Sequence, residues 1–440
     1  MGPDLSTCRE WNLLLCRALL LVGERAKGDR HTVANGGTRL KIAQIAPLAE
    51  SVPPTLYGGT ERVVSWLVEE LVELGHDVTL FASGDSVTRA KLVSVLPRAL
   101  RLGRPRSDPI AAQAVLLETM AEHVFDFDVI HAHIDWLHLP LLSRLGVPFV
   151  TTLHGRLDLR GLSDVIGRFP AAPLVSISNN QRLPIGEKAN WIGTIYHGLP
   201  ANALRPAFKA GSYLAFLGRL TADKGPETAI RIARAAGIPL RIAAKVPRAD
   251  RRYFKERLEP LIDGRRVQLI GEVNDESKQD FLAAAAALLF PIDWPEPFGL
   301  VMIEAMACGT PVIAFRRGSV PEVVDHGVTG FVVDGEAEAV QAVENLGELN
   351  RHEVRARFEQ RFTAKQMARQ YLQHYERLRL PVAIRDKLPA MFSPASAAGV
   401  ALLNEAKPEL NRQIELKRPI NEHLDAVHVR DNPVMSDDRD

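Results

Sequence analysis

Short apolar segments alternate with longer amphipathic segments between residue 40 and about residue 200. The segments KIAQIAPL, HDVTLFAS, FDVIHAH, PFVTTLH and PLVSISN are too short for helices, and several are rich in valine and isoleucine, so they predict buried strands. Between the first two, TERVVSWLVEELVELGH has apolar residues at helical spacing. Strands that alternate with helices predict a parallel sheet that helices cover on both faces.

The same alternation begins again after residue 210. The segments SYLAFLGRL, PLRIAAKV, VQLIGEV, LLFPIDW, PVIAFRRG and GFVVDG predict a second set of strands, and we expect helices at 226–236, near 253–261, at 281–287 and at 298–307. The predicted fold class is therefore α/β, with two doubly wound, Rossmann-like domains that face each other across a cleft.

A stretch with two prolines and two glycines, NWIGTIYHGLPANALRPAF, separates the two series and predicts a domain boundary at about residues 198–210. Beyond residue 381 the scattered prolines and the acidic end SDDRD predict a tail rather than a third catalytic domain. We therefore expect a flexible N-terminal extension over 1–38, a first domain over 39–200, a second domain over 206–362, a helix over 363–380, and a tail or small added segment over 381–440.

Composition narrows the function classes. With 54 Lys and Arg residues against 53 Asp and Glu residues, the net charge of +1 disfavours a dedicated nucleic-acid binder. Three cysteines are too few for a disulfide framework or a four-cysteine zinc site, which fits a cytoplasmic location. Residues 13–22 are the most apolar stretch near the start, but they include Arg17 and number about ten against the roughly 20 that a spanning helix needs, so we expect no transmembrane helix.

The most informative segment is WPEPFGLVMIEAMACGTPVIAF. The prolines on either side of Glu296 place this glutamate in a rigid loop ahead of the expected helix at 298–307. The backbone N–H groups of Phe298, Gly299 and Leu300 then lie at a helix N-terminus and Glu304 follows lower on the helix, an arrangement that suits a polyhydroxylated ligand with a phosphate. Alternatively, the two glutamates are a helix cap and a solvated side chain.

Two further segments carry candidate ligand-binding residues at strand ends. FLGRLTADKGPETAI places Arg219 and Lys224 after a buried strand, where two cations can hold a diphosphate, although loop cations are more often solvated. YGGTERVV places Gly58 and Gly59 before a helix, where glycines allow a close approach of the backbone to a ligand; a purely structural turn is the alternative. Thr60 is expected to cap that helix, which would then begin at residue 61.

Several polar side chains are ambiguous from sequence alone. TLHGRLD places His154 at a strand end on the same side. GSVPEVV places Glu322 after another strand, where it could orient the loop of Glu296 or cap a helix, and we favour the capping role. The pair Asp126 and Asp128 looks like a metal-binding motif, as do the residues that alternate along the next strand, His131, His133 and Asp135. Because both aspartates precede an apolar strand, we expect them to be solvated and expect no metal site.

A run of basic residues without an acidic one extends from Arg89 to Arg106 in the first domain. Such a run is usually a solvated face. The alternative is contact with an anionic membrane surface or with an acidic acceptor.

These motifs, in this order over residues 40–380, resemble the retaining glycosyltransferases of family 4, which have the GT-B fold. The run EPFGLVMIEAMACGTPVIA matches the family position by position, which implies that Glu296 contacts the transferred sugar and Glu304 the nucleotide ribose. The resemblance also implies that Arg219 and Lys224 bind the donor diphosphate, that the glycine loop lies near the donor phosphate, and that His154 lies against the transferred sugar. In this fold the last helix, FTAKQMARQYLQHYERL, crosses back onto the first domain.

The function implied is metal-independent transfer of a hexose from a nucleoside-diphosphate sugar, a co-substrate, to an unidentified carbohydrate, lipid or small-molecule acceptor, with no cofactor and no nucleic-acid partner. The alternatives are a phosphorylase or a nucleotide-sugar epimerase of the same fold, or a protein that binds nucleotide sugars without turnover. The expected catalytic residues are His154, Glu296, Arg219 and Lys224, and the expected donor-binding residues are Gly58, Gly59, Phe298, Gly299, Leu300 and Glu304.

Overall fold

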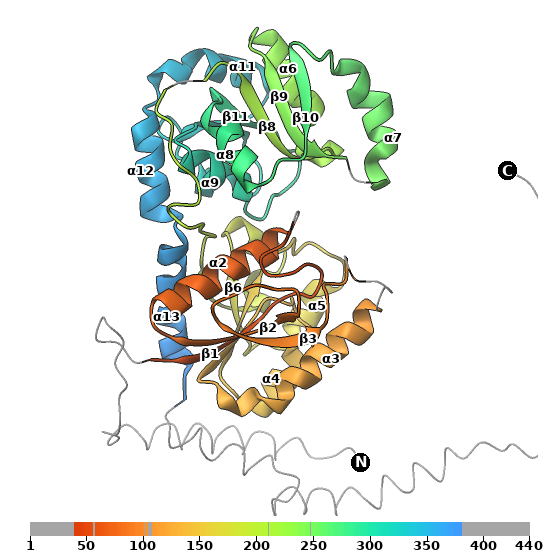
Figure 1. Ribbon diagram of the computed structural model, residues 1–440, viewed down its shortest axis with the longest axis vertical. Coiled ribbons are helices and arrows are strands. Elements are labelled where there is room, and N and C mark those ends of the chain that lie inside the picture. The colour runs from red at the N-terminus through yellow and green to blue at the C-terminus, as the bar shows by residue number, and fades with distance from the viewer. Residues whose placement is uncertain are drawn as a thin grey trace, which may run out of the picture. The chain divides into compact units, whose positions relative to one another are not determined.

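The computed structural model describes residues 39–380, apart from 56–57, 102, 104–107, 210 and 247. The expected N-terminal extension and the expected tail after residue 380 lie outside the described residues. Two parallel sheets with helices packed against them make up the described part of the chain, which confirms the α/β fold class (Figure 1).

The first sheet has seven parallel strands in the order β3-β2-β1-β4-β5-β6-β7. Their bounds are β1 (Lys41–Ile45), β2 (Asp77–Ser83), β3 (Lys91–Leu96), β4 (Val129–Ala132), β5 (Phe149–Leu153), β6 (Pro173–Ser176) and β7 (Asn190–Thr194). The helices of this half are α2 (Gly59–Glu73), α3 (Pro109–Glu122), α4 (Leu139–Leu145) and α5 (Leu162–Gly167), with 3-10 turns η1 (Val124–Asp126), η2 (Asn180–Arg182) and η3 (Gly186–Lys188). The strand order reverses between β1 and β4, and ligands of open parallel sheets bind at such a reversal.

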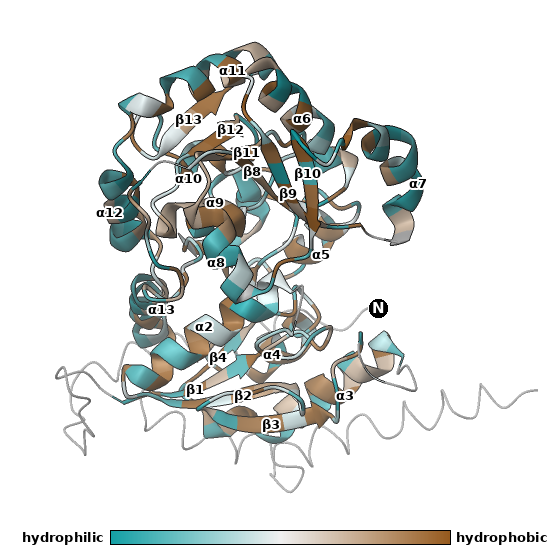
Figure 2. Ribbon diagram, turned by 45° about the horizontal axis from the view of Figure 1, so that its top comes forward, coloured by the Kyte–Doolittle hydropathy of each residue, from teal (hydrophilic) through white to brown (hydrophobic). Residues whose placement is uncertain are grey.

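The second sheet has six parallel strands in the order β10-β9-β8-β11-β12-β13. Their bounds are β8 (Leu214–Arg219), β9 (Leu240–Lys245), β10 (Val267–Gly271), β11 (Ala287–Phe290), β12 (Val312–Phe315) and β13 (Gly330–Val333). The helices are α6 (Pro226–Ala235), α7 (Arg251–Tyr253), α8 (Asp275–Ala283), α9 (Leu300–Ala307), α10 (Val320–Val323), α11 (Glu336–Glu344) and α12 (Arg351–Arg361). Figure 2 shows hydrophobic residues concentrated on the strands and polar residues on the outer faces of the helices, as expected for sheets covered on both faces.

The last described helix, α13 (Ala364–Leu378), packs on the first sheet and beside α2. Its apolar face includes Met367, Tyr371 and Tyr375, all at most 2% exposed. A bridge between Leu199 and Thr363 joins the start of this helix to the segment between the two sheets. Burial of two tyrosine hydroxyls in the core of the first sheet requires hydrogen-bond partners there.

The structure corrects several sequence-based boundaries. β3 and β7 were not predicted; both are edge strands of the first sheet and are at most partly buried. The helix expected at 281–287 is α8 at Asp275–Ala283, which the Asn274 side chain caps. Near 253–261 the chain forms one α-helical turn followed by a π-helical and a 3-10 segment. Thr60 does not cap α2, since the helix already begins at Gly59 and has Gly58 at its N-cap.

Candidate active site

All ten residues expected to act in catalysis or donor binding line one cavity of about 1020 Å³. Arg219 ends β8, His154 directly follows β5, and the glycine loop follows β1, so the cavity lies at the carboxyl ends of strands from both sheets. Seven basic and five acidic side chains line it. This excess of positive charge, carried on a parallel-sheet edge, favours an anionic ligand.

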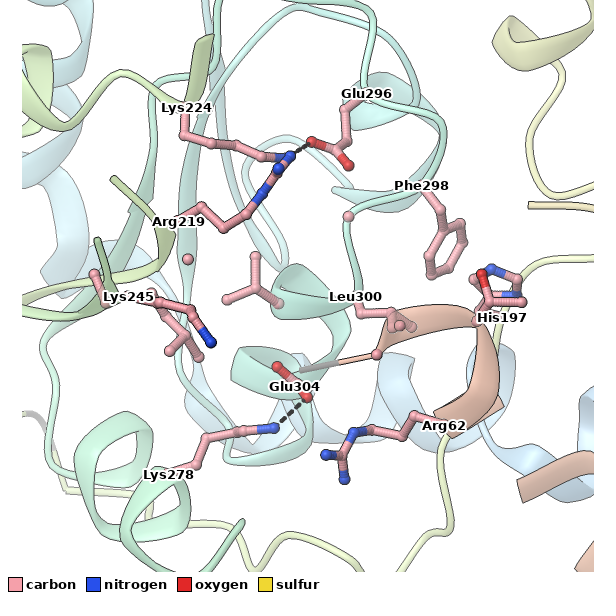
Figure 3. Close-up of a pocket in the computed structure, with 18 of the residues that line it drawn as sticks. Arg62, His197, Arg219, Lys224, Lys245, Lys278, Glu296, Phe298, Leu300 and Glu304 are labelled. Carbon is pink, nitrogen blue, oxygen red and sulfur yellow. Dashed lines mark hydrogen bonds and ion pairs between the residues drawn. The ribbon is translucent and has the colours of Figure 1, made fainter. Parts of the chain in front are cut away.

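Glu296 lies in the loop after β11 and forms an ion pair with Lys224 (Figure 3). The two side chains are only 12% and 15% exposed, and the Lys224 ammonium also lies 4.8 Å from the centre of the Trp294 ring. The backbone of Ser319 donates a hydrogen bond to the Glu296 carbonyl oxygen at 2.9 Å. The ion pair fixes the side chain of Glu296, and the hydrogen bond from Ser319 fixes its backbone. The alternative that Glu296 caps the following helix is wrong, since the N-cap of that helix is Gly299 and no side chain caps it.

Glu304 lies on α9 and accepts a hydrogen bond at 2.8 Å from Lys278 of α8 (Figure 3). Both side chains are largely buried, at 9% and 14% exposed. The alternative of a solvated side chain is therefore wrong for Glu304. Lys278 was not expected in the site, because no local spacing relates it to a glutamate 26 residues away; only the packing of α8 against α9 brings them together.

The start of α9 lies between the two glutamates. The helix begins at Leu300 and not at Phe298, since Gly299 is its N-cap and has a φ of 80°. A Cβ at Gly299 would lie 2.9 Å from the terminal methyl group of Met302, which can move, and 3.1 Å from Phe290, so the backbone angle is the stronger reason for glycine here. Phe298 is buried with its ring 4.9 Å from that of His197, another cavity residue that the sequence did not suggest.

Further cations surround the same space. Figure 3 shows Arg219 and Lys224 directed toward each other from β8 and from the 3-10 turn Ala222–Lys224. Lys245 of β9 is the register partner of Arg219, and its ammonium points away from this pair. Arg62 of α2 also lines the cavity, opposite the second sheet. Lys245 and Arg62 were missed because a single cation next to a strand end or inside a helix has no distinguishing pattern.

His154 lies at the wall of the cavity with its ring stacked on His197 at 5.1 Å. Its Nε2 is 2.8 Å from Nδ1 of His133. Burial lowers the pKa of His154 to about 3, so its ring is neutral at physiological pH. A neutral histidine can donate or accept a hydrogen bond here but cannot supply a positive charge.

The glycine loop before α2 is tightly packed. A Cβ at Gly58 would lie 2.8 Å from Pro54 and 3.1 Å from the carboxylate of Glu61, and a Cβ at Gly59 would approach Leu300 of α9 to 3.7 Å. Glu61 is 5% exposed, and burial raises the pKa of its carboxyl group. Gly58 is therefore required by close packing as well as by any approach to a ligand.

The structure gives other roles to the residues that looked like metal ligands. Asp128 accepts a hydrogen bond at 2.7 Å from the Lys41 backbone, and Asp126 pairs with His123 at 3.2 Å, both at the amino end of β4, away from the cavity. His131 and His133 are buried, and both of their ring nitrogens form hydrogen bonds with protein side chains. Among the described residues no group of three potential ligands converges in a way that could hold a metal ion.

Two other ambiguous features have clear contacts. Glu322 accepts hydrogen bonds at 2.7 Å from the backbone N–H groups of Asn179 and Asn180, so it caps the short helical turn η2 of the first half. In the basic run, Arg89 pairs with Glu69 and Glu73 on the surface, and Arg101 pairs with the buried Glu50 at 2.6 Å and lines the cavity. Arg104 and Arg106 lie outside the described residues. No helix in the described part of the chain is long and apolar enough to cross a membrane.

Comparison with known proteins gives consistent matches. The family model described as Glycosyltransferase Family 4 matches residues 57–181, and the model described as Glycosyl transferases group 1 matches residues 205–365. A curated relative, the D-inositol 3-phosphate glycosyltransferase of Pseudarthrobacter chlorophenolicus, is 25% identical over 333 residues, which cover 63% of this chain and 79% of the relative.

Solved structures with the same architecture include AviGT4, a glycosyltransferase involved in avilamycin A biosynthesis. It is 28% identical with a TM-score of 0.58, and the match covers 77% of this chain and 98% of AviGT4. Anabaena HepE, solved in complex with UDP-glucose, is 19% identical with a TM-score of 0.61. The match covers 77% of this chain and 100% of HepE. At that identity the likeness to HepE is one of fold.

Proposed function

Since the chain belongs to glycosyltransferase family 4 and has the GT-B fold, we propose that it is a retaining hexosyltransferase that takes a hexose from a nucleoside diphosphate without a metal ion. The observation that carries this proposal is the pairing of Glu296 with Lys224 and of Glu304 with Lys278 on either side of the α9 N-terminus. Carboxylates suit sugar hydroxyls, whereas lysines and a helix N-terminus suit phosphates.

In this proposal Glu296 contacts the transferred hexose and Glu304 the ribose. Arg219 and Lys224 bind the diphosphate, and the backbone N–H groups at Phe298, Gly299 and Leu300 add the partial positive charge of the helix start. Lys224 has three donors, so it can bind a phosphate oxygen while it keeps its contact with Glu296. Gly58 and Gly59 allow the backbone of the first half to approach the phosphate.

The chemical step breaks the bond between the anomeric carbon and the diphosphate oxygen and forms a bond to an acceptor hydroxyl oxygen on the same face. The hydroxyl proton passes to the departing diphosphate. Negative charge grows on the diphosphate as the bond breaks, and Arg219 and Lys224 stabilise it. Because His154 is neutral, it adds no positive charge, and the negative charge on the diphosphate is balanced by Arg219 and Lys224.

The acceptor is an unidentified carbohydrate, lipid or small molecule that enters from the side of the first sheet. Arg62 and Arg101 lie on that wall of the cavity, which supports an acceptor with a negative group. The relative named above carries inositol 3-phosphate in its name, so this phosphorylated polyol is the first acceptor to test.

Thermal-shift measurements with UDP-, GDP- and ADP-hexoses test the donor. A ligand at about 100 times its dissociation constant stabilises a fold by roughly 2.7 kcal/mol, which is readily measured. If no nucleotide sugar raises the melting temperature, the proposed function is wrong.

Product analysis separates this function from its alternatives. An epimerase would release an altered nucleotide sugar without any acceptor, and a phosphorylase would consume or form a sugar phosphate. A binding protein would show no donor hydrolysis above that of a Glu296→Gln control. We expect slow donor hydrolysis that depends on Glu296 and faster transfer once an acceptor is supplied.

A further inference from the structure

A chain of buried hydrogen bonds connects α13 to the cavity. Gln44 of β1 donates from Nε2 to the Tyr375 hydroxyl at 3.1 Å, and its Oε1 lies 2.8 Å from Nε2 of His133. Nδ1 of His133 lies 2.8 Å from Nε2 of His154. Gln44, His133 and Tyr375 are 0%, 3% and 0% exposed, so water does not compete for these contacts.

The chain has a branch that also starts at Tyr375. The tyrosine hydroxyl lies 2.7 Å from Nδ1 of His131, whose Nε2 lies 2.8 Å from the Thr152 hydroxyl. Thr152 in turn contacts the hydroxyl of Tyr371 at 2.8 Å. Tyr371 therefore ends the branch, whereas Tyr375 lies where the branch and the path to His154 meet.

The donors and acceptors along these hydrogen bonds determine which ring nitrogen of His154 carries the proton. Burial keeps the pKa of His133 well below its usual value, so this histidine is neutral and carries one ring proton. The Gln44 carbonyl oxygen can only accept, which places that proton on Nε2 of His133. Nδ1 of His133 must then accept, so His154 donates from Nε2 and carries its remaining lone pair on Nδ1.

This assignment depends on the orientation of the Gln44 amide. With its oxygen and nitrogen exchanged, each histidine connected to it would carry its proton on the other ring nitrogen. In the orientation assigned here the amide nitrogen lies 3.1 Å from the Tyr375 hydroxyl, a normal N–H···O distance, and the amide oxygen lies 2.8 Å from Nε2 of His133.

We infer that Tyr375, Gln44 and His133 are positioning residues that hold His154 as its Nε2–H tautomer, so that its Nδ1 recognises a ligand hydroxyl by accepting its hydrogen bond. Nδ1 of His154 has no hydrogen-bond partner among the described residues, as is also true of Nδ1 of His138 and His197. The atom is closed to solvent, so a ligand hydroxyl reaches it only after the cavity wall moves. The identity of that ligand as a sugar rests on the proposed function; the tautomer does not. A phosphate or carboxylate oxygen would meet a lone pair there and be disfavoured.

Nitrogen-15 NMR of the histidine-labelled, ligand-free protein tests the tautomer directly, because long-range proton–nitrogen correlations show which ring nitrogen carries the proton. We expect His154, His133 and His131 all to be protonated on Nε2. Assignment uses single His→Gln variants. Protonation of His154 on Nδ1 would overturn the inference, whatever the enzyme proves to transfer.

Two tyrosine variants on the same helix test the positioning role. Tyr375→Phe removes the acceptor that orients Gln44, so we expect a mixed His154 tautomer and a loss in kcat/KM of roughly 2- to 10-fold, the size of one neutral hydrogen bond. Tyr371→Phe is the matched control, since it removes an equally buried hydroxyl only at the end of the branch and should leave the His154 tautomer unchanged. An unchanged tautomer in both variants, or the same change in both, would contradict the role of Tyr375. If Tyr375→Phe does not fold, the wild-type spectrum still decides the inference.

Donor analogues test the recognition step. Fluorine in place of a hydroxyl keeps an acceptor but removes the donor, so one monodeoxyfluoro nucleotide hexose should bind the wild type roughly 2- to 10-fold more weakly than its parent and show no such difference with His154→Ala. Equal binding of every fluorinated donor would refute recognition by Nδ1. Failure of all parent nucleotide hexoses to bind would instead refute the proposed function.

Discussion

Gly318 supports the Glu296 loop, and a single methyl group there should misplace the glutamate without unfolding the protein. A Cβ at Gly318 would lie 2.3 Å from the backbone nitrogen and 2.4 Å from the carbonyl oxygen of Glu296. Restoring ordinary contact distances requires a shift on the order of 1 Å, and both atoms belong to the backbone, so the whole loop must move. Gly318→Ala therefore acts on the residue proposed to contact the transferred sugar.

The magnitude has two parts that a control separates. Gly318 has a φ of 54°, so alanine there costs on the order of 1–2 kcal/mol of stability from the backbone alone. Gly327 has a φ of 77° but no atom within 4 Å of the added Cβ, so Gly327→Ala carries the same backbone cost without the contact. A misplacement of about 1 Å can cost about 100-fold in rate, or about 2.7 kcal/mol of transition-state stabilisation.

Initial rates of sugar transfer or donor hydrolysis, measured beside the melting temperature of each variant, provide the assay. We expect both alanine variants to be destabilised and only Gly318→Ala to lose about 10- to 100-fold in kcat. If the two variants have the same kcat, Glu296 is not positioned by this loop or does not act in the reaction.

Three further outcomes concern the same site, and a fourth concerns a buried histidine outside it. Calorimetry and kinetics should show that Glu304→Ala weakens donor binding whereas Glu296→Gln mainly lowers kcat; unchanged constants in both would show that the pair is misassigned. Lys278→Met should weaken donor binding as well, because it leaves the largely buried Glu304 carboxylate without its partner; wild-type affinity would contradict this role. Transfer should continue at close to the untreated rate in excess EDTA, and loss of activity that magnesium or manganese restores would contradict a metal-free step. Burial holds the pKa of His138 at about 3, below its unfolded value, so urea titrations should show the free energy of unfolding falling as pH drops below about 6.5, by roughly 1 kcal/mol for this histidine between pH 6.5 and 5.5; a constant free energy over that range would argue against its buried neutral state.

The sequence was sufficient for the central strands and for the residues at their ends. β1, β8 and β12 are short apolar runs flanked by turn residues, and that pattern identified the sheets. β3 and β7, the edge strands of the first sheet, were missed, whereas β10 and β13, the edge strands of the second sheet, were predicted from their apolar residues. β3 has apolar residues as well but lies within the basic run that starts at Arg89, where the sequence suggested a solvated face.

Site residues could be predicted from the sequence only where they lie close together in one short segment. Glu296, Glu304 and Gly299 lie within one short segment, whereas Lys278 reaches Glu304 from another helix. The alternating histidines of β4 suggested metal ligands, but their partners, such as Gln44 and Tyr375, come from distant elements that the sequence does not relate to them. Hydrogen-bond partners of buried polar groups are set by tertiary packing.

The anomeric configuration of the first sugar released tests the central claim most directly. Hydrolysis of an α-linked nucleotide hexose, followed by proton NMR before mutarotation, reports the stereochemistry without knowledge of the acceptor. We expect the α-hexose to form first, with wild-type protein and not with Glu296→Gln. Initial formation of the β-hexose would contradict a retaining glycosyltransferase built on this site.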